Sequence, residues 1–110
     1  MDCLFCAIGR GDIPATVVDQ NDDVVAFRDI NPEAPVHVLV IPRQHHATIE
    51  SLTADARLTA ELMSMAAKIG ASEGTNGHRI VLNTGAHGGQ TVHHVHAHVL
   101  AGRNLQWPPG

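Results

Sequence analysis

The stretch Val92-His93-His94-Val95-His96-Ala97-His98-Val99-Leu100 carries the strongest indication of both fold and chemistry in this chain. Histidines and small or β-branched residues alternate in it, and successive side chains of a strand point to opposite faces of a sheet. We therefore predict a last strand over residues 92–101, with His94, His96 and His98 on one face. The residues between them, Val95, Ala97 and Val99, should point into the core.

Three imidazoles on one face of a strand would surround a small common volume, because alternate Cα atoms lie about 6–7 Å apart. Such a cluster has three interpretations: a solvated polar face, a three-histidine metal site, or a catalytic cluster with one imidazole as nucleophile and another as proton donor. The preceding Gly88-Gly89-Gln90-Thr91 offers backbone N–H groups and a hydroxyl, which suit phosphate oxygens. This loop favours chemistry at phosphorus.

The sequence before this strand predicts further strands and one long helix. We expect a short helix over residues 3–10, ended by Gly9 and Gly11, and strands at 17–18, 24–27, 36–41 and 80–82, with a loop over 83–90. A long helix should begin near residue 51, with Ser51 or Thr53 as its N-cap. Its apolar stripe comprises Leu58, Leu62, Met65, Ala66 and Ile69. Short connections favour an α+β fold with an antiparallel sheet of about five strands, in a single domain of residues 1–110.

Composition excludes several classes of partner. The 110 residues include nine histidines and no tyrosine, and the formal net charge is −4. The seven basic residues are scattered singly, so the basic stripe typical of nucleic-acid binding is missing from the sequence. No apolar run approaches the ~20 residues of a membrane span, and Met1-Asp2-Cys3 does not resemble the start of a signal peptide. We expect a cytoplasmic protein without nucleic-acid or membrane partners.

Two cysteines form a Cys3-x-x-Cys6 pair near the N-terminus. A thioredoxin-type redox pair would follow a strand in a βαβ context, which the pattern lacks. Two other interpretations stay open. The pair supplies half of a zinc site if two histidines join it, or it comprises two small buried thiols on the first helix.

The histidine strand and several other segments resemble the histidine triad (HIT) family. His94 to Leu100 matches the pattern His-φ-His-φ-His-φ-φ, in which φ is hydrophobic. The resemblance extends to Phe27-Arg28-Asp29-Ile30-Asn31-Pro32, Ala34-Pro35-Val36-His37, Ile41-Pro42-Arg43-Gln44-His45, Asn83-Thr84-Gly85 and Gly88-Gly89-Gln90-Thr91. The ending Trp107-Pro108-Pro109-Gly110 is similar to the Hint branch, the purine nucleoside phosphoramidases. The match covers nearly the whole chain.

This resemblance implies a role for each matching residue. His96 would be the nucleophile, His98 and Thr91 would contact the leaving group, and His37 and His94 would help orient His96. Nucleotide binding would fall to Asp29 at the ribose, Phe27 and Ile30 at the base, and Asn83 and Gly89 at the phosphate, together with Thr91, His96 and His98. Without the resemblance, Asp29 could be a loop cap, and His37, Phe27 and Ile30 could be plain core residues. His93 receives no role.

The function implied is hydrolysis of the P–N bond of purine nucleoside 5′-phosphoramidates through a nucleotidyl-histidine intermediate. The alternatives are a dinucleoside polyphosphate hydrolase or nucleotidyl transferase, and a nucleotide-binding module without catalysis. The set Cys3, Cys6, His45 and His94 resembles the zinc site of some members of the superfamily. Four protein ligands leave no open position, so such a zinc would be structural, and no cofactor would be required for catalysis.

The resemblance also implies a homodimer in which two protomers share a continuous sheet. A chain of 110 residues has a limited core, and pairing would bury apolar surface that one copy cannot cover. We expect residues 80–82 and the helix over 58–69 to form the contact. Trp107 is followed by two stiffening prolines, so we expect the tail to reach the partner's site, although plain local packing would also account for this residue.

Overall fold

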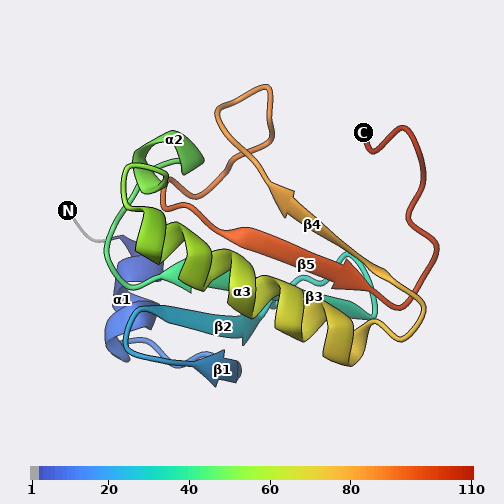
Figure 1. Cartoon of the computed structure of the whole chain (residues 1–110), viewed down its shortest axis with the longest axis horizontal. Coiled ribbons are helices and arrows are strands. Elements are labelled where there is room, and N and C mark those ends of the chain that lie inside the picture. Colours follow the sequence, from blue (N-terminus) through green and yellow to red (C-terminus); the bar gives the residue numbers. More distant parts are fainter. Residues whose placement is uncertain (1–2) are drawn as a thin grey trace.

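The computed structural model describes residues 3–110 of the chain. It contains the helices α1 (Leu4–Arg10), α2 (Ile49–Leu52) and α3 (Ala56–Glu73), and the strands β1 (Val17–Gln20), β2 (Val24–Arg28), β3 (Val36–Pro42), β4 (His78–Leu82) and β5 (Ala97–Ala101). The strands form one antiparallel sheet in the order β1-β2-β3-β5-β4 (Figure 1). The predicted α+β class, with an antiparallel five-stranded sheet, one long helix and a short N-terminal helix, is confirmed.

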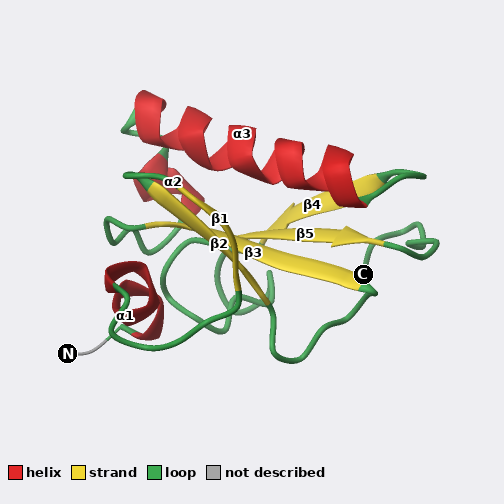
Figure 2. Cartoon of the chain, turned by 90° about the horizontal axis from the view of Figure 1, so that it is seen from below, coloured by secondary structure: helices red, strands yellow, loops and turns green. Residues whose placement is uncertain are grey.

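The two faces of the sheet carry separate apolar clusters, because side chains alternate along each strand. Helix α3 covers one face, and α1 lies on the other (Figure 2). The whole predicted stripe of α3, from Leu58 to Ile69, packs with Val95, Ala97 and Val99. On the opposite face Phe5 of α1 packs with Phe27 and Leu39. The site described below lies on the α1 face.

The last strand is shorter than predicted. It begins at Ala97, whereas we expected a strand from Val92. The neighbouring strand β3 ends at Pro42, which has no N–H to continue the ladder. The backbone N–H of Val95 donates instead to the carbonyl of His46, at 2.7 Å. Residues 92–96 therefore run outside the sheet, and the prediction that three histidines lie on one face of one strand is wrong.

The start of the long helix also differs from the prediction. A separate turn, α2, precedes α3, and Asp55 rather than Ser51 or Thr53 caps α3, with its Oδ1 accepting from the Leu58 N–H at 3.0 Å. The side chains of the two predicted N-cap residues instead form hydrogen bonds with other nearby residues. The hydroxyl of Ser51 lies 2.8 Å from Nδ1 of His46, and that of Thr53 donates to the Glu50 carbonyl.

At the N-terminal end, α1 runs through Gly9 and stops before Gly11, whose φ of 80° is the left-handed conformation that glycine adopts readily. The predicted stop at Gly9 is therefore wrong, whereas the one at Gly11 is confirmed. Met1 and Asp2, which entered the expectation about a signal peptide, lie outside the described residues. Within residues 3–110, none of the helices combines the length and the apolarity that a membrane crossing requires.

Candidate active site

Three imidazoles converge on the α1 face, where β3 and β5 run side by side. The ring of His96 lies 4.8 Å from that of His98, and the ring of His98 lies 5.2 Å from that of His37. His37 and His98 occupy adjacent strands, β3 and β5, with neighbouring positions in the register. His96 immediately precedes β5, and Phe5 of α1 meets its ring edge-on at 5.1 Å. His37 takes the place in this cluster that the sequence suggested for His94.

A backbone hydrogen bond determines the tautomer of His96. Its Nδ1 lies 2.8 Å from the carbonyl oxygen of His94 in a buried environment. A carbonyl only accepts, so Nδ1 must carry the proton and donate it. Nε2 therefore holds a lone pair and is the nucleophilic nitrogen of the ring.

The same reasoning extends through His37 to His98. The backbone N–H of Glu33 donates to Nδ1 of His37 at 3.0 Å, so the proton of His37 is on Nε2. That N–H lies 2.9 Å from Nδ1 of His98, which must accept it. His98 then carries its own proton on Nε2, a buried atom without a partner among residues 3–110. The cluster thus combines a lone pair on His96 with an unused N–H on His98.

Burial favours the neutral form of His96 and His98 by lowering the pKa of each ring. It lowers the pKa of His98 to about 4, with the nearby His96 and His37 acting in the same direction. Burial also lowers the pKa of His96, partly offset by its hydrogen bond to the His94 carbonyl. Near pH 7 the His96 lone pair is consequently available rather than protonated.

The ring of His94 points away from this cluster. Its Nε2 lies 2.8 Å from the carbonyl of Pro42, which makes Nε2 the protonated nitrogen and leaves the lone pair on Nδ1. That Nδ1 lies 3.3 Å from Sγ of Cys3 and 3.5 Å from Sγ of Cys6. Burial lowers the pKa of His94 to about 4, so the ring is neutral at pH 7.

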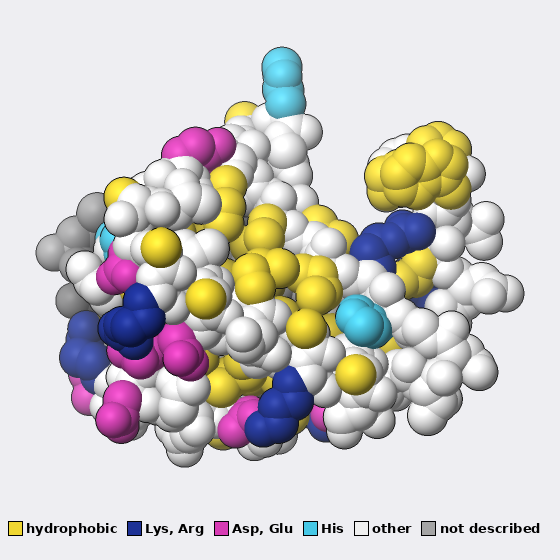
Figure 3. All heavy atoms as spheres, in the orientation of Figure 1, with side chains coloured by type: hydrophobic (Ala, Val, Ile, Leu, Met, Phe, Trp, Pro, Cys, Tyr) yellow, Lys and Arg dark blue, Asp and Glu magenta, His cyan; other side chains and the backbone are white. Residues whose placement is uncertain are grey.

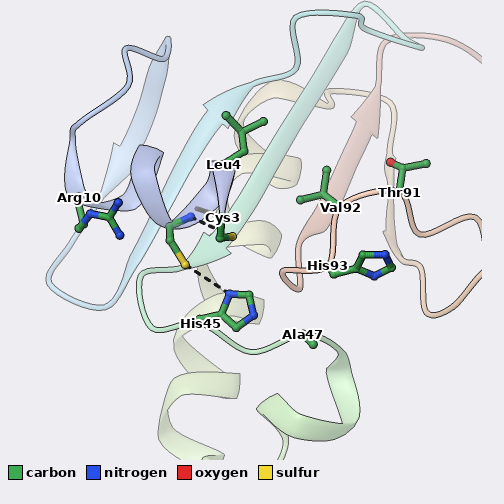
Figure 4. Close-up of a pocket in the computed structure, with 9 residues that line it drawn as sticks. Cys3, Leu4, Arg10, His45, Ala47, Thr91, Val92 and His93 are labelled. Carbon is green, nitrogen blue, oxygen red and sulfur yellow. Dashed lines mark hydrogen bonds between the residues drawn. The ribbon is translucent and has the colours of Figure 1, made fainter. Parts of the chain in front are cut away.

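His45 completes a four-residue group with His94 and the two cysteines. Its Nδ1 lies 3.3 Å from Sγ of Cys6 (Figure 4), and the four ligand atoms all lie within 4.8 Å of one another. With Zn–S of about 2.3 Å and Zn–N of about 2.0 Å, the S···N edge of a tetrahedral site is about 3.5 Å. The observed distances and the free lone pair on His94 fit a zinc ion.

A cavity of about 370 Å³ adjoins the imidazoles. Four of the predicted nucleotide ligands besides His96 and His98 line it: Phe27, Asp29, Ile30 and Thr91. Oδ2 of Asp29 lies 3.4 Å from Nε2 of His37, and its Oδ1 accepts from the Asn31 N–H. Asn83 and Gly89 are not among the residues that line this cavity, so their predicted phosphate contacts stay predictions.

Sequence reasoning missed several residues that shape the site. Phe5, Ile8 and Leu39 line the apolar part of the cavity. Their only signal was apolar periodicity, which core residues share. The buried side chain of Gln90 donates to the carbonyls of Ala47 and Val92 and accepts from the Gly85 N–H, and so holds the loop before Thr91. A glutamine beside two glycines gave no reason to expect burial.

The chain is similar to known proteins in sequence and in fold. The chain is 42% identical over 107 residues to the purine nucleoside phosphoramidase of Escherichia coli K12, covering 94% of this chain and 90% of that one. It is 40% identical over 111 residues to a 14 kDa zinc-binding protein of Zea mays, covering 97% and 87%. The crystal structure of a HIT family hydrolase from Legionella pneumophila Philadelphia 1 superposes with a TM-score of 0.93 at 47% identity, covering 99% and 100%. A model of the HIT domain matches residues 10–105, and the chain therefore belongs to the HIT domain family.

Proposed function

We propose that this protein hydrolyses the P–N bond of purine nucleoside 5′-phosphoramidates. The observation that supports this most directly is the pairing of a lone pair on Nε2 of His96 with a buried, unpartnered N–H on Nε2 of His98. Displacement of an amine from phosphorus needs both a nucleophile and a proton donor. The similarity to a purine nucleoside phosphoramidase supports the same reaction class.

The reaction proceeds in two balanced steps. In the first, Nε2 of His96 forms a bond to phosphorus and the P–N bond breaks. The amine takes the Nε2 proton of His98 in its imidazolium form, which the bound anionic phosphoramidate favours, and His98 becomes neutral. In the second, water attacks phosphorus, its proton returns to His98, and the bond from phosphorus to His96 breaks. The products are a nucleoside monophosphate and an amine, and no cofactor takes part.

The positions of the other side chains suit this pathway. The His94 carbonyl holds the ring of His96 through Nδ1, and His37 holds that of His98, so each ring presents Nε2 to the substrate. The aromatic and apolar walls contributed by Phe5, Phe27 and Ile8 suit a purine. The Asp29 carboxylate accepts from a ribose diol in this proposal, and Thr91 also lines the cavity.

We further propose a structural zinc ion held by Cys3, Cys6, His45 and His94. The ion would tie α1 to the segments before α2 and β5, and catalysis would not pass through it because all four positions are filled by protein. Similarity to a zinc-binding protein of Zea mays supports this. Metal analysis should find one zinc per chain, and Cys6→Ser should lower the zinc content and the thermal stability. Zinc-free protein with an unchanged melting temperature would exclude the proposal.

The decisive experiment compares two substrates, and the affinity for AMP, in wild type and His96→Asn. Wild type should hydrolyse AMP methylamide faster than diadenosine tetraphosphate. Rapid denaturation at alkaline pH, where a phosphorus–histidine bond is stable, should trap a nucleotidyl adduct on His96 visible by mass spectrometry. The variant should form no adduct and lose turnover while keeping AMP affinity within about tenfold. Faster cleavage of the dinucleotide would favour a polyphosphate hydrolase, and AMP binding without turnover in wild type would favour a binding module.

A further inference from the structure

A second cavity, of about 640 Å³, lies next to the nucleotide cavity. It is bounded by the N-terminal part of α1, the segment 91–93 and the segment 45–47 (Figure 4). Its lining consists of Cys3, Leu4, Cys6, Arg10, His45, Ala47, Thr91, Val92 and His93. The thiols and His45 belong to the proposed zinc site, but neither that site nor the nucleotide explains the cavity itself.

Three residues line both cavities: Leu4, Thr91 and Val92. The nucleotide cavity contains Asp29 and Ile30 as well as His96 and His98, and the second cavity adjoins it across Thr91. A substrate with its nucleoside beside Asp29 and its phosphorus at His96 can therefore extend the remaining substituent past Thr91. That substituent is the amine which the reaction releases.

We propose that this second cavity binds the body of the amine leaving group and so determines which phosphoramidates are used. The proposal rests on the proposed function, because it assigns the released half of the same substrate. It adds a specificity site built from the N-terminal helix and the residues around Ala47, and it gives His93 a position in that site.

The lining indicates the chemical class of the amine. Leu4, Ala47 and Val92 provide apolar surface. None of the nine lining residues, all within the described range, is Asp or Glu. Arg10 is the cationic residue of the lining, and its Nε donates to Asp12 outside the cavity at 2.8 Å. Two thiolates would balance the charge of a bound zinc ion. An amine with an apolar or anionic tail should therefore be preferred over one with a cationic tail.

The test uses four AMP phosphoramidates, those of methylamine, butylamine, 4-aminobutyrate and 1,4-diaminobutane. With wild type, kcat/KM for the butylamine and aminobutyrate compounds should exceed that for the diaminobutane compound about fivefold or more. Ala47→Glu places a carboxylate in the cavity and should raise the diaminobutane-to-butylamine ratio about tenfold. Ala47→Phe fills the cavity and should lower the butylamine-to-methylamine ratio to a similar extent.

Ala54, an exposed alanine in the turn between α2 and α3, provides matched controls, because Ala54→Glu and Ala54→Phe make the same changes away from the cavity. The controls should keep the wild-type ratios, and zinc content and melting temperature should match wild type in every variant used. Methylamide turnover with ratios unchanged by either Ala47 variant would overturn the leaving-group site alone. No turnover of any of the four compounds by wild type would overturn the proposed function and this site together.

Discussion

At the scale of single residues, hydrogen bonds give His96 and His98, two side chains of the same type, different tautomers. His96 donates through Nδ1 to a carbonyl, whereas His98 accepts through Nδ1 from His37. The two Nε2 atoms consequently differ, one holding a lone pair and the other a proton. Both rings are kept neutral by burial, which favours the uncharged form of an imidazole.

The loss of activity on replacing His98 should depend on the leaving group of the substrate. His98→Asn should lower kcat/KM for AMP methylamide by about 10²–10⁴-fold, because the amine must leave protonated. The p-nitrophenyl ester of AMP releases a stable anion, so the loss with it should be less than about tenfold. Steady-state kinetics with both substrates make the comparison. Equal losses with the two substrates would contradict the role of His98 as proton donor.

The same residue should contribute to the pH dependence of stability. Between its ordinary pKa near 6.5 and the lowered value of about 4, the unfolded chain binds a proton at His98 that the folded chain does not. Its contribution is therefore fully present above about pH 6.5 and is lost as the pH falls toward 4. Urea midpoints at about pH 7 and pH 5 should differ less in His98→Asn than in wild type.

His94 has a pKa lowered in the same direction, so the slope in His98→Asn should shrink without vanishing. A slope identical to that of wild type would show that His98 does not take up a proton differently in the folded and unfolded states.

At the scale of elements, α3 and α1 lie on opposite faces of the sheet (Figure 2). Helix α3 packs into the main core. On the other face Phe5 of α1 packs with Phe27 and Leu39, and the thiols of Cys3, the N-cap of α1, and of Cys6 lie beside His94. The periodicity of α3 was readable because apolar residues recur at helical spacing. The residue at which α3 starts could not be predicted from the sequence, because Ser51, Thr53 and Asp55 are all good N-cap residues. Only the fold of the surrounding chain selects among them.

The cap at Asp55 should contribute measurably to stability. Asp55→Ala removes the acceptor of the Leu58 N–H and should lower the free energy of unfolding by about 1 kcal/mol. Ser51→Ala, at the predicted but unused cap, is the matched control and should cost clearly less. Urea unfolding of both variants tests this, and an equal cost for the two would argue against Asp55 as the cap.

At the scale of the whole molecule, two features of the described chain are exposed. Within residues 3–110, strand β4 lies at an edge of the sheet, next to β5. The C-terminal arm stands away from the body of the protein (Figure 3), and the side chain of Trp107 on it is 81% exposed. We propose that these features contact a second copy of the chain, with β4 and α3 in the contact and the arm near the partner's site.

A cytoplasmic location and a single domain over residues 1–110 likewise stay predictions.

Assembly is tested by light scattering at micromolar concentration, which should give the mass of a dimer. Deletion of residues 104–110 should leave the protein folded but change which amines it releases, because the indole would contact the leaving group from the neighbouring protomer. A monomeric mass would rule out the dimer, and an unchanged amine preference after the deletion would rule out the role of the arm alone.

The sequence by itself determined the α+β class, the antiparallel sheet, the apolar stripe of α3 and the family, because hydrophobic periodicity and motif spacing are local along the chain. Only the tertiary structure decided where each imidazole points. The ring of His94 points away from the cluster of His37, His96 and His98 because Pro42 ends the neighbouring strand and its carbonyl accepts the His94 Nε2–H. The tautomers of His96 and His98 likewise depend on partners that folding brings within hydrogen-bond distance, and alternation along a strand carries no information about them.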